Sequence, residues 1–139
     1  FRKDRAPKNE AKPAVKAPSC PRWLHREAKR EWRRIVPELL TLGLLSQIDR
    51  AALAAYCEAY AEWWEADRTI REEGRYQTFI TKTGSEYRQV HPAVGVKNNA
   101  IDRMRRFASE FGMTPAARTR VEAAERDEKP KDPAERFFA

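Results

Sequence analysis

The chain has 139 residues, a charged fraction of 35% and a mean hydropathy of −0.84, which fits one domain with a modest core. Its longest unbroken apolar run, Ala51–Cys57, excludes a membrane-spanning helix, which needs about 20 apolar residues. The net charge of +7 is unevenly placed: residues 1–36 hold 12 Lys and Arg against 4 Asp and Glu, whereas residues 37–74 hold 3 against 8. Concentrated positive charge beside an acidic body favours a polyanionic partner, most often nucleic acid.

Residues 1–21 contain four of the nine prolines, six Lys or Arg and almost no side chain that a core could bury. This composition predicts a disordered basic arm. The arm could be a solvated linker or a segment that follows a phosphate backbone. No apolar signal segment stands at its start, so we expect a soluble protein of the cytoplasm. Cys20 and Cys57, without a CxxC motif, are expected to be reduced thiols.

The segment Arg22–Leu40 has the periodicity of an amphipathic helix, with Leu24, Ala28, Trp32, Ile35 and Leu39 on one face. A basic strip within about 100° lies on the opposite face and consists of Arg22, Arg26, Lys29, Arg30 and Arg33. Five like charges on one face repel each other unless a partner neutralises them, so we favour contact with a DNA backbone over a merely solvated face. Glu27 and Glu31 are expected to border the strip without neutralising it. Pro37 predicts a kink or break near Arg33–Val36.

A long helix is predicted over Ser46–Glu73, after a turn at Thr41–Leu45. Ser46 and Asp49 provide an N-terminal signal and Gly74 a C-terminal one, so the helix is about 40 Å long. Its acidic residues and its length disfavour a helix that reads the major groove of DNA. One face carries more large side chains than a single partner helix covers. We therefore predict an oligomer interface of Leu53, Tyr56, Tyr60, Trp63 and Trp64.

Arg75–Val90 changes to strand–turn–strand chemistry around Lys82-Thr83-Gly84-Ser85. An isolated hairpin is marginal in water, so this one should pack on the helices or pair with hairpins of neighbouring subunits. A second long helix, about Ala93–Phe111, should pair antiparallel with the first. Its basic residues could meet acidic partners in the same subunit or a neighbour, and Asp67 is the expected acceptor for one of its arginines.

The rest of the chain offers little chemistry. Thr114-Pro115 starts a short helix that extends to about Glu128, and the terminal Phe137-Phe138 either fray or dock into a partner. The two histidines, His25 and His91, lack metal-ligand spacing, and no P-loop, GxSxG or HExxH motif is present. We therefore expect no enzyme activity, no cofactor and no metal.

The order of short motifs along roughly Pro18–Val121 resembles the P27 family of bacteriophage terminase small subunits. The resemblance rests on Cys20-Pro21-x-Trp23-Leu24, Ile35-Val36-Pro37-Glu38-Leu39, Gly43-Leu44-Leu45-Ser46-x-x-Asp49, Ala54-Ala55-Tyr56-Cys57-Glu58-Ala59-Tyr60, His91-Pro92 and Phe111-Gly112-Met113-Thr114-Pro115. Family members often have Asn-Pro where this chain has His91-Pro92.

The resemblance implies a non-enzymatic DNA-binding subunit of a viral genome-packaging motor. Such subunits form homo-oligomeric rings, bind double-stranded viral DNA in the host cytoplasm and present it to a large ATPase and nuclease subunit. The family provides no compact DNA-contact signature, so the basic strip rests on charge alone. The alternative is a helical oligomeric adaptor or a DNA-binding regulator without a packaging role.

These observations together predict a mainly α fold. A long antiparallel helical hairpin carries a small β-hairpin between its two long helices, with a basic N-terminal helix before it and a short C-terminal helix after it. The predicted divisions are a basic arm at residues 1–21, a helical oligomerisation and DNA-recognition domain at residues 22–128, and a flexible tail at residues 129–139.

Overall fold

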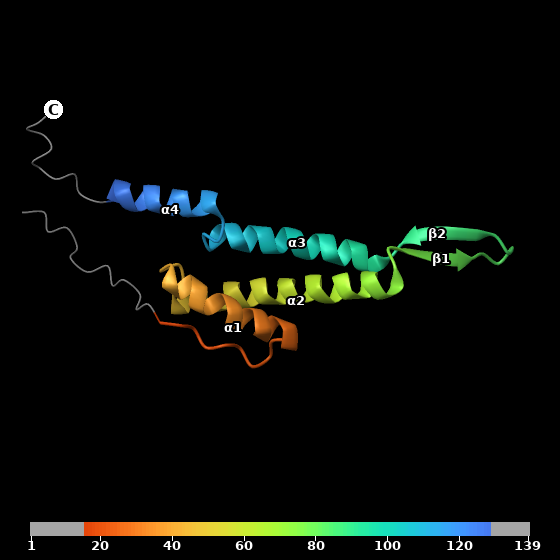
Figure 1. Cartoon of the computed structure of the whole chain (residues 1–139), viewed down its shortest axis with the longest axis horizontal. Coiled ribbons are helices and arrows are strands. Elements are labelled where there is room, and N and C mark those ends of the chain that lie inside the picture. The colour runs from red at the N-terminus through yellow and green to blue at the C-terminus, as the bar shows by residue number, and fades with distance from the viewer. Residues whose placement is uncertain (1–15, 129–139) are drawn as a thin grey trace, which may run out of the picture.

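The fold of residues 16–128 is described by a computed structural model. Its elements are α1 (Arg26–Thr41), the 3-10 turn η1 (Gln47–Asp49), α2 (Arg50–Glu73), β1 (Tyr76–Ile80), β2 (Glu86–Val90), α3 (Pro92–Glu110) and α4 (Pro115–Glu128). Helices α2 and α3 lie side by side and antiparallel, α1 packs on α2, and the β-hairpin extends beyond the helices (Figure 1). The predicted fold class is confirmed. The arm residues before Lys16 and the tail after Glu128 lie outside the described residues.

Helix α1 buries its whole predicted apolar stripe against α2. Leu24, just before the helix, and Ala28, Trp32, Ile35 and Leu39 within it are all core residues. The helix begins at Arg26, not Arg22, because Arg22 and Trp23 form a turn closed by the Leu24 amide and the Pro21 carbonyl.

Of the kink or break predicted near Arg33–Val36, a break is wrong, since α1 continues through Pro37 to Thr41. Proline removes one hydrogen bond from the helix, but buried side chains on both sides of it, Val36 and Leu39, hold the two halves on the same core.

Part of the predicted arm is packed rather than free. Pro21 is fully buried, Cys20 packs against the core, and the Ser19 carbonyl accepts a 2.8 Å hydrogen bond from the Arg50 guanidinium. This short segment therefore joins the body of the protein at the start of α2. It fixes the point from which any preceding chain must leave.

The ends of α2 match their sequence signals. Ser46 and Asp49 form a capping box, in which the Asp49 carboxylate accepts hydrogen bonds from the Ser46 amide (2.8 Å) and hydroxyl (2.9 Å). The first turn is the 3-10 turn η1, so the α-helix itself begins at Arg50 rather than Ser46. Gly74, with a φ of +87°, ends α2 and directs the chain into β1.

Helix α3 packs along α2 and is tied to it by ion pairs. Arg103 binds Glu62, and Lys97 binds Asp67 at 2.6 Å. The expected pairing of the basic helix with the acidic one is thus present within one chain. The expectation that Asp67 accepts from an arginine of α3 was wrong: its partner on α3 is Lys97, while Arg71 of its own helix approaches at 2.7 Å. The spacing along α3 places Lys97, not Arg103, beside Asp67.

The C-terminal end of α3 closes the core next to the turn before η1. Phe111 is buried, and Gly112 follows it with a φ of +68°. A Cβ at Gly112 would lie 3.4 Å from Leu44, so this glycine allows both the turn and a close approach. The predicted start of α4 is confirmed, because the Ala117 amide donates to the Thr114 hydroxyl at 3.2 Å.

Strands β1 and β2 pair only with each other within the described chain, with Tyr76 opposite Val90 and Ile80 opposite Glu86. Nine of their ten residues are exposed, and Gln77 is the exception. Of the two predicted arrangements, packing on the helices does not occur within one chain, because the hairpin leaves the end of the α2–α3 pair and points away from it (Figure 1). Pairing with hairpins of neighbouring subunits stays a prediction. Its apolar side chains remain uncovered.

Candidate nucleic-acid interface

The basic strip predicted from sequence lies on the outer face of α1 and in the turn before it. Arg26, Lys29, Arg30 and Arg33 follow spacings of three and four, so they share the face opposite the buried stripe. All except the partly buried Lys29 are exposed, and Arg22 is exposed in the preceding turn. The opposite face of α1 is packed in the core, so the backbone positions of the basic residues are fixed along one exposed face of the helix.

Two strip residues have a carboxylate partner. Glu27 accepts from Arg30 at 2.9 Å and also lies 3.6 Å from Arg26. The expectation that Glu27 borders the strip without neutralising it was therefore wrong, because its side chain folds toward both arginines. Within residues 16–128, Arg22, Lys29 and Arg33 have no carboxylate within ion-pair distance. These three are the strip residues without a carboxylate partner, while Arg26 and Arg30 share the single negative charge of Glu27.

Glu31 was expected to border the strip as well, but the structure buries it. Its side chain is 1% exposed and accepts two hydrogen bonds from the Arg34 guanidinium, at 2.6 and 2.7 Å, and one from the Tyr56 hydroxyl at 3.0 Å. The hydrogen bond to Glu31 raises the pKa of Arg34 above its usual value. Burial, followed by the charge of Glu31, raises the pKa of Tyr56. This polar cluster joins α1 to α2 directly beneath the strip.

The residues predicted to form an oligomer interface divide into two groups. Leu53 and Tyr56 are buried in the core of a single chain. Tyr60, Trp63 and Trp64 are partly exposed. The rings of Tyr60 and Trp63 are 5.5 Å apart, and the Arg68 guanidinium lies 5.4 Å from the Trp64 ring. Only the second group retains surface that a partner could cover.

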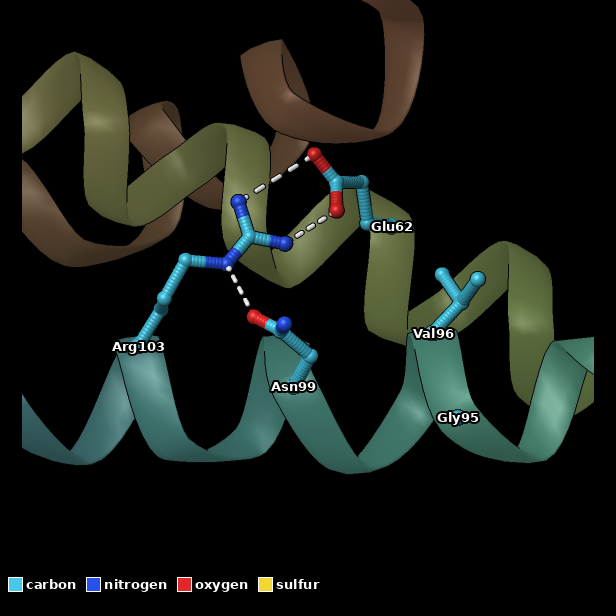
Figure 2. A pocket seen from close by; sticks show the side chains of 5 residues that line it. All are labelled: Glu62, Gly95, Val96, Asn99 and Arg103. Carbon is cyan, nitrogen blue, oxygen red and sulfur yellow. Dashed lines mark hydrogen bonds and ion pairs between the residues drawn. The ribbon is translucent and has the colours of Figure 1, made fainter.

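A pocket of about 530 Å³ opens at the seam between α2 and α3 and is lined by Glu62, Gly95, Val96, Asn99 and Arg103. The Arg103 guanidinium reaches across it to the Glu62 carboxylate, and its Nε donates to Asn99 at 3.2 Å (Figure 2). The hydrogen bond to Glu62 raises the pKa of Arg103. The two charged side chains of the pocket, Arg103 and Glu62, bind each other. The pocket therefore contains an ion pair that links α3 to α2.

The two histidines also join elements to each other. The ring Nδ1 of His25 lies 2.9 Å from the Glu58 carboxylate, which raises the pKa of His25 chiefly through that hydrogen bond. His91 accepts from the Ala93 amide at its Nδ1 (3.0 Å), so its Nε2 faces Glu73 at 2.8 Å as a donor. Among residues 16–128, no three His, Cys, Asp or Glu side chains are grouped to hold a metal ion.

The sequence reasoning missed the cluster of Glu31, Arg34 and Tyr56. A signal was available: Glu31 follows Ala28 by three residues and precedes Ile35 by four, which places it within the buried stripe. A carboxylate at such a position needs a cation nearby, and Arg34 is one turn further along.

Cys57 gives a prediction about reactivity. Its thiol is fully buried between α1 and α2, and burial raises its pKa to about 12. Because the thiolate is the reactive form, Cys57 should not react with Ellman's reagent at pH 8 while the protein is folded. We expect one thiol, that of the partly exposed Cys20, to react promptly and the second to react only in denaturant. Prompt reaction of the one remaining thiol, Cys57, in a folded Cys20→Ser variant would contradict this burial.

The fold and the site define a class: a small helical protein built on an α2–α3 hairpin, with an exposed basic face on a third helix. In the described part of the chain, no helix combines the length and apolar character needed to cross a membrane. The family model described as phage terminase, small subunit, matches residues 28–128. The chain belongs to the phage terminase small subunit family, and membership indicates a role in phage DNA packaging. Searches of curated proteins and of solved structures returned no match.

Proposed function

We propose that this protein is the DNA-binding, non-enzymatic small subunit of a viral genome-packaging terminase. It assembles as a homo-oligomeric ring in the host cytoplasm, recognises double-stranded viral DNA and presents it to the large subunit that carries ATPase and nuclease activity. The family match over residues 28–128 supports the packaging role. The observation that supports DNA contact is the exposed basic face of α1, in which Arg22, Lys29 and Arg33 have no acidic partner among the described residues.

Ring assembly is supported by the side chains that one chain leaves partly exposed. Tyr60, Trp63 and Trp64 form an aromatic patch on α2, and such residues are enriched in protein–protein interfaces. The P27 group within the family remains our assignment from the sequence motifs. A helical adaptor or a DNA-binding regulator would share this fold, but a regulator needs a helix that enters a groove, and the long helix α2 is too long and too acidic for that role.

The test is a pair of measurements on the full chain. Native mass spectrometry at micromolar concentration should show an assembly larger than a dimer, and duplex DNA should bind with an affinity that falls steeply as salt rises. A monomer would refute the ring. An assembly that fails to bind duplex DNA, even at 50 mM salt, would favour the adaptor. ATP hydrolysis or DNA cleavage that disappears with a point mutation in this chain would overturn the non-enzymatic assignment.

A further inference from the structure

Trp23 is a large aromatic residue that the fold leaves in water directly beside the basic strip. It follows Arg22 in the turn before α1 and is 68% exposed. In the motif Cys20-Pro21-x-Trp23-Leu24, the other named residues pack in or against the core. A single exposed apolar residue is common on protein surfaces, so exposure alone indicates nothing. Trp23 differs in how firmly its turn is held and in the charges on both sides of it.

The turn that carries Trp23 is anchored before and after it. Pro21 is fully buried, and the amide of the buried Leu24 donates to the Pro21 carbonyl at 3.5 Å. The His25 amide then donates to the Glu58 carboxylate of α2 at 3.2 Å. The backbone on each side of Trp23 is therefore fixed to the body of the protein. A side chain on such a fixed backbone loses less conformational freedom when a partner covers it.

The chain on both sides of Trp23 is basic. Residues 22–26 contain two arginines and no carboxylate. Arg22 is exposed and has no carboxylate within ion-pair distance among residues 16–128. The Arg26 side chain is 88% exposed, and its carboxylate partner, Glu27, is shared with Arg30. Charge complementarity favours a polyanion as the partner of this surface.

A second copy of the chain fits this surface less well. Its acidic element is α2, which has six carboxylates. Five of them already bind basic side chains of their own chain: Glu58, Glu62, Asp67, Glu72 and Glu73. Little free negative charge is left on α2 to meet the arginines beside Trp23.

Duplex DNA offers both kinds of contact that this surface needs. Its phosphates accept hydrogen bonds from arginine, and sugar and base surfaces lie beside them. Proteins place apolar side chains against such surfaces in the grooves of DNA, and aromatic rings stack on bases. An aromatic ring held between two arginines therefore matches one stretch of a DNA strand.

We propose that Trp23 contacts duplex DNA, with its indole ring against sugar and base surface beside the phosphates that Arg22 and Arg26 bind. The proposal rests on the proposed DNA-binding function and adds a contact of a different kind to the same face. Arginine contacts weaken as salt rises because they release counterions, whereas an uncharged ring releases none. Trp23 thus contributes affinity that does not depend on salt.

The test measures binding of a mixed-sequence duplex as a function of salt by the full chain. Trp23→Ala is compared with Leu42→Ala, because Leu42 is also large, apolar and more than half exposed but lies in the turn after α1. We expect Trp23→Ala to lower affinity about tenfold at every salt concentration with an unchanged salt slope. Trp23→Phe keeps an aromatic ring and should recover part of this loss. Leu42→Ala should bind as the wild type does.

A second measurement follows the indole ring itself. The chain has four tryptophans, so the change in fluorescence on adding duplex DNA is compared between the wild type and Trp23→Phe. We expect most of that change to be absent from Trp23→Phe, because the other three tryptophans lie outside the proposed contact.

Several results would overturn the inference while DNA binding by the wild type still stands. These are an unchanged affinity in Trp23→Ala, an equal loss in Leu42→Ala, or a fluorescence response that Trp23→Phe retains. A flattened salt slope in Trp23→Ala would mean that displaced arginines cause the loss, and a smaller assembly would make Trp23 a contact between subunits. A wild type that does not bind duplex DNA would refute the proposed function and this inference with it.

Discussion

Replacing Arg22, Lys29 and Arg33 together by alanine should weaken DNA binding by a factor on the order of 10² to 10³ at 0.1 M salt for each subunit that engages DNA. These are the strip residues without a carboxylate partner in the described chain, so each is free to neutralise a phosphate. Each phosphate neutralised contributes about −0.9 to the slope of log K against log salt concentration, and the triple variant should flatten that slope by about 2.7. The loss should be similar for all DNA sequences, because phosphate contacts do not read bases.

The matched control removes the same number of charges elsewhere. Arg105, Arg106 and Arg120 are exposed on α3 and α4, away from the strip. DNA affinity is measured as a function of salt for the wild type and both triple variants, and the mass of each assembly is checked. The comparison distinguishes a loss of local phosphate contacts from an effect of net charge. Equal losses in both variants would mean that overall charge drives binding. A larger loss in the control would move the DNA site to α3 and α4.

Arg34→Ala should lower the free energy of unfolding by about 3 kcal/mol, because it leaves the buried Glu31 carboxylate without its cation. Tyr56 still donates one hydrogen bond to Glu31, which keeps the loss from being larger. The measurement is urea unfolding at one fixed protein concentration, because dissociation of an assembly also shifts the midpoint.

Arg33→Ala is the natural control, since Arg33 is the adjacent arginine and has an exposed side chain. It should change stability by less than about 0.5 kcal/mol and yet weaken DNA binding, whereas Arg34→Ala should do the reverse. The double variant Arg34→Ala with Glu31→Ala should lose much less free energy of unfolding than the sum of the two single variants, because neither charge is then left unpaired. Equal stability of the Arg33 and Arg34 variants would show that Glu31 does not depend on Arg34.

Local sequence signals determined the elements of this protein and most of their ends. The spacing of Trp32, Ile35 and Leu39 predicted the buried face of α1, and the Ser46–Asp49 pair and Gly74 marked where the long helix begins and ends. Such signals depend on residues within one or two turns, so the sequence displays them directly. Net charge along the chain likewise showed which helix is basic and which is acidic.

Only the tertiary structure decided which neighbour each face meets. A helical wheel gives the direction of a side chain but not how far a partner helix covers it. A helical wheel therefore placed Glu31 at the border of the basic strip, although its side chain is buried. It also could not show that a single chain already buries Leu53 and Tyr56. The rule that proline breaks a helix considers only the helix itself. It leaves out the packing of Val36 and Leu39 on the core, which keeps α1 continuous across Pro37. The exposure of Ile80 depended on where the hairpin leaves the α2–α3 pair, which is a property of long-range geometry rather than of any short segment.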